Sequence, residues 1–186
     1  MPLAAARFVP DPTQWRNSGA SYQVLLAWIT PSDFERLAHE ALGMRGFDIA
    51  NFKLNTAMAY PTSKESKLGE SPGLYRSMYE GIPITPPYLD LENAVMLNIL
   101  EAPNGYLHRI TGATPNVKVR GAEGRNRARI AWELGIPLIP TRFYIHGLKN
   151  WFSGYEIFEP IWERPDIEAQ ILRNLGIREF RLDKVG

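Results

Sequence analysis

The sequence predicts an α+β fold, a small mixed sheet flanked by helices, and three observations support this prediction. The chain has 186 residues, a length that fits one domain with appendages. Apolar residues make up 45% of it and charged residues 22%, as in a globular protein with a substantial core. Short runs rich in β-branched and aromatic residues alternate with helical segments that open at proline and close at glycine.

The N-terminal part predicts an arm, a strand and a helix, in that order. Residues 1–20 combine prolines with scattered polar residues, so we expect a flexible arm that can cross the partner subunit of a homodimer. The apolar run at 22–29 predicts a strand. Residues 30–33, Thr-Pro-Ser-Asp, have the pattern of a capping box with proline at the first helical position. The helix that they open is expected to reach Leu42 and to end at Gly43.

The middle of the chain predicts a long loop, a short helix and further strands. Residues 46–70 are polar and lack periodicity, which is typical of a long loop. Residues 71–80 begin with Ser-Pro and stop before Gly81, so they predict a short helix. Three prolines within residues 82–87 exclude a regular central strand and predict a rigid linker. Strand segments are expected at residues 88–92, 94–100 and 106–110, with a turn at 103–105.

The next segment predicts a strand, a helix and a second strand. Alternating valine and basic residues fit a half-buried strand over 116–121. Residues 125–134 predict a helix that Gly135 ends, and residues 138–145 predict the following strand. This order within about 30 residues is that of a βαβ-like unit, although the sequence leaves the direction of strand pairing open.

The C-terminal residues predict an extension of the same domain. Residues 147–186 begin with a cluster of aromatic side chains, and a helix at 167–175 and a short strand at 178–182 follow. We therefore expect an arm at 1–20, a domain at 21–146, and a C-terminal extension that packs on that domain.

The composition excludes several functional classes. The chain has no cysteine, which excludes disulfide scaffolds, thiolate zinc sites and cysteine nucleophiles. Its three histidines lack the spacing of metal ligands, so we expect no metal site built by a cluster of protein side chains. No apolar run is long enough to span a membrane, and we expect a cytoplasmic protein without a membrane partner. The net charge of +1 gives no sign of a polyanionic partner.

The segment 121–129 carries the clearest functional signal, because a strand runs there into the basic start of a helix. The first N–H groups of a helix lack intrahelical partners and the helix dipole is positive at that end, so an anion is favoured. Glycine lets a phosphate approach the backbone, and arginine forks match phosphate oxygens. The residues expected to bind phosphate or nucleotide are Gly121, Gly124, Arg125, Asn126, Arg127 and Arg129.

The same spacing also allows a purely structural interpretation. Arg125 and Arg129 are four residues apart and can form a solvated helix face, with an Arg129–Glu133 pair that adds a small stabilising term. Glu123 precedes the expected anion site, where a carboxylate must either pair with an arginine or take part in the chemistry. The residues alone leave these alternatives open.

Residues 123–140, EGRNRARIAWELGIPLIP, resemble the signature segment of the ParB/sulfiredoxin superfamily. In that segment a glycine- and arginine-rich turn opens a helix, which ends in glycine and continues into an Ile-Pro strand. Residues 66–89 resemble the upstream part of the domain, and residues 28–34 are similar to the opening of ParB-like proteins of phages and mobile elements. The resemblance covers residues 22–146 and implies a compact ParB/sulfiredoxin-like domain in a bacterial or phage-infected cell.

The resemblance implies roles for individual residues of the loop. Glu123, Arg125 and Arg127 fall where the ParB phosphate-binding box has a glutamate and two arginines. The position of Arg125 is that of the reactive cysteine of sulfiredoxins, so sulfinic-acid reductase activity is excluded. Asn126 and Ala122 stand where related sequences are expected to have histidine. The segments with which chromosome-partitioning ParB clamps DNA, and a helix-turn-helix domain, are not recognisable in the sequence.

The resemblance implies a nucleotide-binding enzyme that performs phosphoryl transfer or nucleotide hydrolysis, as CTP-hydrolysing and ADP-dependent serine kinase members of the superfamily do. The expected ligand is ATP, ADP or CTP together with Mg²⁺. Glu123 and Glu80 are the candidate catalytic carboxylates, and Asp90 is a candidate Mg²⁺ contact. Glu80 can equally be an ordinary surface charge at a helix end.

The alternative function is that of a DNA-binding ParB-like module or nuclease without nucleotide turnover. Aromatic residues such as Trp151 and Tyr155 can stack on bases, although such residues more often lie in a core or a subunit contact. A third alternative is a structural or accessory phage protein that keeps the fold without catalysis. The basic patch of the DNA-binding alternative would comprise Lys118, Arg120, Arg125, Arg127, Arg129 and Arg142.

Overall fold

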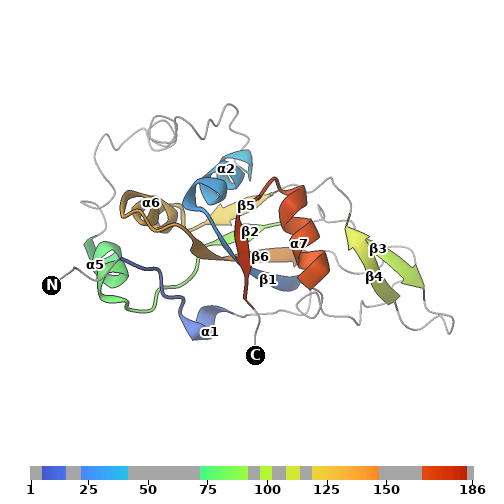
Figure 1. The fold of residues 1–186 in the computed structure, drawn as a ribbon, viewed down its shortest axis with the longest axis horizontal. Helices are drawn as coiled ribbons and strands as arrows, with labels where there is room; N and C mark the ends of the chain where they lie inside the picture. Colours follow the sequence, from blue (N-terminus) through green and yellow to red (C-terminus); the bar gives the residue numbers. More distant parts are fainter. Residues whose placement is uncertain are drawn as a thin grey trace.

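The computed structural model describes residues 6–15, 22–41, 72–91, 97–101, 108–113, 119–146 and 165–183 (Figure 1). The helices are α1 (Pro12–Trp15), α2 (Pro31–Ala41), α5 (Pro72–Glu80), α6 (Arg125–Glu133) and α7 (Pro165–Asn174). The strands are β1 (Tyr22–Ile29), β2 (Tyr88–Asp90), β3 (Leu97–Glu101), β4 (His108–Ala113), β5 (Gly121–Glu123), β6 (Ile139–His146) and β7 (Phe180–Leu182). Helices and a mixed sheet occur together, which confirms the predicted α+β class.

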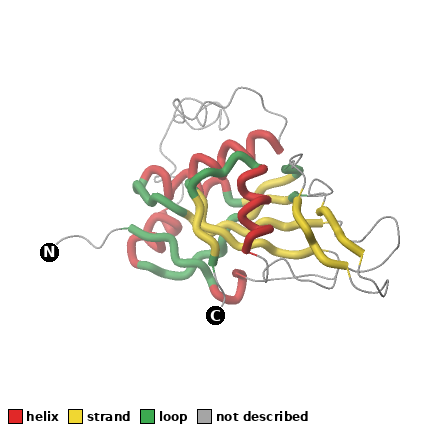
Figure 2. The backbone as a smooth tube through the Cα atoms, turned by 45° about the vertical axis from the view of Figure 1, so that its right-hand side comes forward, coloured by secondary structure: helices red, strands yellow, loops and turns green. Residues whose placement is uncertain are grey.

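A five-stranded sheet with the strand order β5-β2-β6-β1-β7 forms the centre of the described structure. β1 and β6 pair antiparallel over their full length, from Tyr22 opposite His146 to Ile29 opposite Ile139. β2 pairs parallel with β6, while β5 and β7 pair antiparallel with β2 and β1 at the two edges. A separate two-stranded sheet, β3-β4, lies beside α7 (Figure 2).

The core lies on one face of the central sheet, because side chains alternate between the two faces along each strand. This face carries Leu25 and Ala27 of β1, Leu89 of β2 and Phe143 of β6, all of them fully buried. They join the buried residues of α2, α6 and α7 in a single hydrophobic cluster. The helices therefore cover this face, and their positions relative to the sheet are fixed by its packing.

The opposite face of the sheet, called the outer face below, has a different composition. Leu26 of β1 lies opposite Arg142 of β6, and Tyr88 of β2 is the register partner of Arg142 on the other neighbouring strand. Trp28 of β1 points the same way, and its ring lies 6.3 Å from that of Trp15 in α1. In the view of Figure 1, α2 lies above the central strands and α1 below them. The outer face thus brings aromatic and charged side chains together.

The predicted order of strand, helix and strand is present at β5-α6-β6, but it does not form a βαβ unit. β2 lies between β5 and β6 in the sheet, so the two strands are not neighbours. Since β5 is antiparallel to β2 and β2 is parallel to β6, β5 and β6 run in opposite directions. The strand expected at 116–121 is also shifted: residues 119–120 precede β5, and residues 116–118 lie outside the described ranges. Pairing with β2, which is distant in sequence, decides where this strand begins.

Part of the expected N-terminal arm is packed. Phe8 is only 3% exposed and joins the hydrophobic cluster. The N–H group of Ile84 donates to the carbonyl oxygen of Val9 at 2.8 Å, so residues 6–11 are tied to the segment 82–87. A single phenylalanine among prolines has no periodicity, which explains why the sequence pattern indicated a flexible arm.

The C-terminal extension also contributes to the main structure. β7 pairs with β1 at the edge of the central sheet, and Ile167 and Ile171 of α7 are buried in the core. The expected loop at 46–70, the turn at 103–105, and Lys118, Trp151 and Tyr155 all lie outside the described residues.

The helix boundaries follow the local signals. Thr30 Oγ1 accepts the N–H of Asp33 at 3.1 Å, as the capping box predicts, and α2 is described as far as Ala41. The expected end at Leu42 and Gly43 lies outside the described residues. α5 matches its expected range and α6 ends one residue early. Among the helices that the structure describes, none has the length and apolar character needed to cross a membrane.

Candidate functional site

The turn between β5 and α6 leads into a helix N-terminus without a side-chain cap. Gly124 is the N-cap residue, with φ of 101° and ψ of 22°, in the left-handed region that side chains disfavour. A Cβ atom at this position would lie 2.4 Å from Cβ of Pro87, so only glycine fits. No side chain caps α6, and its first turn contains no acidic residue. The first N–H groups therefore keep the preference for an anion that the sequence predicted.

Arg127 lies over this helix end. Its Cζ atom is 3.2 Å from the place that a Cβ on Gly124 would take, so the guanidinium folds back across the glycine. Nη1 donates to the carbonyl oxygen of Thr85 at 2.5 Å, and Nη2 forms a looser ion pair with Oε1 of Glu123 at 3.4 Å. Burial lowers the pKa of Arg127, and the nearby charge of Arg142 lowers it further, while Glu123 opposes the shift.

Arg125 is held in the interior instead. Its Nε and Nη2 atoms donate to Oε1 of Glu35 in α2 at 3.1 and 2.5 Å. Glu35 is fully buried, and Nε2 of His39 lies 3.3 Å from the same oxygen. The expected phosphate-binding residue Arg125 thus joins α6 to α2. Sequence reasoning missed Glu35, although its place beside the apolar stripe of α2 and four residues before His39 marks it as inward-facing.

The remaining residues of the loop have simpler surroundings. Nε of Arg129 donates to Oε1 of Glu133 at 3.0 Å, and its guanidinium lies 5.2 Å from the Trp132 ring centroid. The i,i+4 pair of the structural interpretation is therefore present. Asn126 is exposed, and Gly121 lies opposite Asp90 in the pairing of β5 with β2.

Glu123 has an arginine partner, which was one of the two alternatives that the sequence left open. Its carboxylate pairs with Arg127, yet its side chain is 62% exposed. It is also hydrogen-bonded to the hydroxyl of Tyr88. Burial raises the pKa of Tyr88, and the negative charge and hydrogen bond of Glu123 raise it further. Glu123 is thus held next to Gly124 but remains accessible to a ligand.

The other two acidic candidates lie in different places. Oε1 of Glu80 forms an ion pair with Nε of Arg76 at 2.9 Å on the exposed side of α5. Among the described residues, Glu80 forms no ion pair with an arginine of the loop. The structure therefore does not bring Glu80 to the helix end. Asp90 lies in β2 on the outer face, two residues after Tyr88. Within the described ranges, no three histidine, aspartate or glutamate side chains gather in a way that could hold a metal ion.

Two tyrosines and Arg142 complete the surroundings of Arg127. Arg142 Nη2 donates to the carbonyl oxygen of Pro86 at 2.8 Å, and Nη1 donates to the hydroxyl of Tyr144 at 2.9 Å. The rings of Tyr88 and Tyr144 meet edge to face with centroids 5.0 Å apart. Sequence reasoning placed Arg142 only in a general basic patch and missed both tyrosines, because their contact depends on the parallel pairing of β2 with β6.

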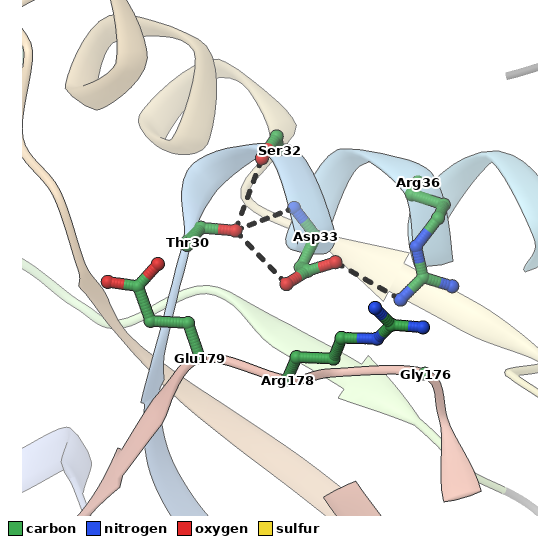
Figure 3. A pocket seen from close by; sticks show the side chains of 7 residues that line it. All are labelled: Thr30, Ser32, Asp33, Arg36, Gly176, Arg178 and Glu179. Carbon is green, nitrogen blue, oxygen red and sulfur yellow. Dashed lines mark hydrogen bonds and ion pairs between the residues drawn. The ribbon is translucent and has the colours of Figure 1, made fainter. Parts of the chain in front are cut away.

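A separate pocket of about 470 Å³ lies between the start of α2 and the turn that follows α7 (Figure 3). Opposite charges within it pair with each other, as Arg36 Nη2 does with Asp33 Oδ1 at 3.2 Å. Small-molecule sites are mostly apolar with a few polar groups, whereas this pocket has no apolar side chain in its lining. It is therefore a weaker candidate than the α6 helix end. The lining residues are Thr30, Ser32, Asp33, Arg36, Gly176, Arg178 and Glu179.

Comparisons of the chain with protein-family models, with curated protein sequences and with solved structures found no match.

Proposed function

We propose that the chain binds the phosphate groups of a nucleotide at the N-terminus of α6, within a ParB/sulfiredoxin-like domain. The observation that carries this proposal is the position of Arg127, whose guanidinium lies over Gly124 at the uncapped start of the helix. The helix end supplies N–H donors and a positive dipole, and the arginine supplies a fork of donors beside them. A phosphate group at this point would be contacted by both.

The proposed set of phosphate-binding groups is narrower than the sequence suggested. Arg125 is engaged by the buried Glu35 and Arg129 by Glu133, so we assign phosphate binding to Arg127 and the first N–H groups of α6. The partner of Arg127 is the exposed Glu123, at the long distance of 3.4 Å. A phosphate can replace this carboxylate, because the pair is long and the carboxylate itself is largely exposed to solvent.

The proposed reaction is nucleotide hydrolysis or phosphoryl transfer, which depends mainly on positioning and charge neutralisation. Glu123, once released from Arg127, is the candidate general base because it adjoins Gly124 and is accessible. Mg²⁺ is commonly held by one or two carboxylates together with substrate phosphates, and Glu123 and Asp90 share the outer face. Asp90 is therefore the candidate Mg²⁺ contact beside the base Glu123, whereas Glu80 pairs with Arg76 on α5.

A nucleotide suits this site better than a DNA backbone does. DNA-binding surfaces present exposed cationic side chains to successive phosphates. Arg125, Arg127 and Arg129 instead form ion pairs with carboxylates, and Arg142 is only 5% exposed. The side chains of these four residues are therefore mostly buried rather than presented to solvent.

Equilibrium titration with ADP, ATP and CTP in the presence of Mg²⁺ tests the proposal. We expect saturable binding of at least one nucleotide. Arg127→Ala should weaken it by about 10-fold or more, since a charge-assisted hydrogen bond contributes about 1.5–3 kcal/mol. Glu123→Gln should still bind the nucleotide and lose its turnover, because the amide cannot act as a base.

Arg76→Ala is the matched control. Arg76 also forms an ion pair with a glutamate, but on the exposed surface of α5, and its side chain is 74% exposed. This variant should bind nucleotides like the wild type. Equal nucleotide affinities of the wild type and Arg127→Ala, or no saturable binding at all, would contradict the proposal. Salt-dependent binding of a DNA duplex without nucleotide binding would favour the DNA-binding alternative.

A further inference from the structure

Arg142 is a buried cation that no carboxylate neutralises within the described part of the chain. It is 5% exposed, and no ion pair of the described residues includes it. Its Nε atom is buried without a hydrogen-bond acceptor there. The other two nitrogens donate to neutral groups, the carbonyl oxygen of Pro86 and the hydroxyl of Tyr144. The rings of Tyr88 and Tyr144 flank it, each with its centroid 5.6 Å from Cζ.

The segment 85–87 holds Arg127 and Arg142 side by side. The carbonyl oxygen of Thr85 accepts from Arg127 Nη1, that of Pro86 accepts from Arg142 Nη2, and that of Pro87 accepts from the Arg142 backbone N–H at 3.0 Å. The two prolines have no N–H group, so their backbone offers acceptors only. Two consecutive carbonyl groups, those of Thr85 and Pro86, thus stabilise two guanidinium groups that otherwise repel each other, and the third fixes the backbone of Arg142 beside them.

The charge of Arg142 reaches the guanidinium of Arg127 at the helix end, because it contributes to lowering the pKa of Arg127. A buried charge without a counterion is unfavourable, and proteins normally pair such a charge. Its field is poorly screened, because little water lies between buried groups. An anion at the start of α6, beside Arg127, would lie within this field.

We propose that Arg142 is a positioning residue of the phosphate site. It does not contact the ligand but raises its affinity through a buried charge that is held on Pro86 and Tyr144 and forms no ion pair with a described residue. The consequence is a selectivity: the site prefers a diphosphate group to a monophosphate, and this preference depends on Arg142. The inference rests on the proposed function for the location of the ligand, and it adds a residue that the motif resemblance does not include.

Titration of the wild type and Arg142→Met with inorganic phosphate and with pyrophosphate tests this inference. We expect the wild type to bind pyrophosphate more tightly than phosphate. Methionine has a similar length and no charge, so the variant should lose about 10-fold or more of its pyrophosphate affinity. Its affinity for inorganic phosphate should fall by a smaller factor, because the lost Coulomb energy scales with the charge of the ligand. A purely structural role would not produce this difference.

Leu26→Ala is the matched control, because Leu26 is 3% exposed and lies directly opposite Arg142 in the sheet. It disturbs the packing at the same place without changing charge, so both affinities should change by the same factor. Without any ligand, Arg142→Met should melt at or above the wild-type temperature. Replacing an uncompensated buried charge by an apolar side chain of similar size is neutral or stabilising.

Several outcomes would overturn the inference. These are equal losses for phosphate and pyrophosphate in Arg142→Met, a much lower melting temperature of this variant, or no binding of either anion by the wild type. Unchanged pyrophosphate affinity in Arg142→Met would also overturn it and would leave the proposed nucleotide site intact. Pyrophosphate binding with the expected dependence on Arg142, but no binding of ADP, ATP or CTP, would overturn the proposed function instead.

Discussion

At the scale of single residues, two arginines at the start of α6 have opposite environments. Arg125 turns inward to Glu35, whereas Arg127 turns back over Gly124 toward Thr85 and Glu123. Positions two apart on a helix differ in direction by about 200°, so one side chain faces the core when the other faces outward. The sequence pattern treats the two arginines alike, but only Arg127 is free to exchange an exposed partner for a ligand.

Arg125→Ala is expected to destabilise the protein rather than to weaken the ligand site directly. The change leaves the buried carboxylate of Glu35 without its arginine, and loss of one partner of a buried pair costs about 3–5 kcal/mol. Urea unfolding followed by circular dichroism measures this loss. The double change Arg125→Met with Glu35→Leu removes both charges and should recover most of the stability.

Arg76→Ala again serves as the comparison, since its exposed pair with Glu80 contributes little. Its free energy of unfolding should stay within about 0.5 kcal/mol of the wild-type value. If Arg125→Ala proved as mild as this control, the Arg125–Glu35 pair would not be the clamp between α6 and α2 that we describe.

At the scale of elements, glycines at both ends of α6 have different functions. Gly135 ends the helix with φ of 72°, and nothing lies within 4 Å of the place that its Cβ would take. Gly124 opens the helix with φ of 101° and faces Pro87 at close range. Gly135 therefore satisfies only a backbone requirement. Gly124 also lets the helix end approach the segment 85–87, which carries the carbonyl acceptors of the guanidinium groups.

Comparison of Gly124→Ala with Gly135→Ala separates these two requirements. Gly135→Ala should cost about 1–2 kcal/mol, the strain of a left-handed alanine. Gly124→Ala should cost more, because its Cβ would lie 2.4 Å from Pro87 Cβ and 2.8 Å from Pro87 Cα. The clash should also displace the Thr85–Arg127 contact and abolish nucleotide binding. Unfolding free energies and nucleotide titration of both variants measure this, and equal losses of stability would show that Pro87 does not confine the turn.

At the scale of the whole molecule, local signals were sufficient for the helices but not for the site. Capping residues, prolines and glycines act within a few positions, so the ranges of α2, α5 and α6 follow from the sequence to within a residue or two. The insertion of β2 between β5 and β6 depends on contacts far along the chain. The Arg125–Glu35 bond joins residues 90 positions apart, and no local pattern specifies such a partner. Motif reasoning located the helix end but not the groups around it.

The packed part of the N-terminal arm is expected to stabilise the segment 85–87 of the site. The variant Phe8→Ala tests this expectation. Phe8 is 3% exposed in the core, so its truncation should cost about 3–5 kcal/mol in urea unfolding. Ile84, whose N–H donates to the carbonyl oxygen of Val9, directly precedes the segment 85–87 that holds Arg127 and Arg142. Its amide should therefore exchange faster in the variant, and nucleotide affinity should fall with it. Ile82→Ala, at a side chain 45% exposed, is the control and should leave all three measurements nearly unchanged. Loss of stability without faster exchange at Ile84 would mean that the arm stabilises the core independently of the site.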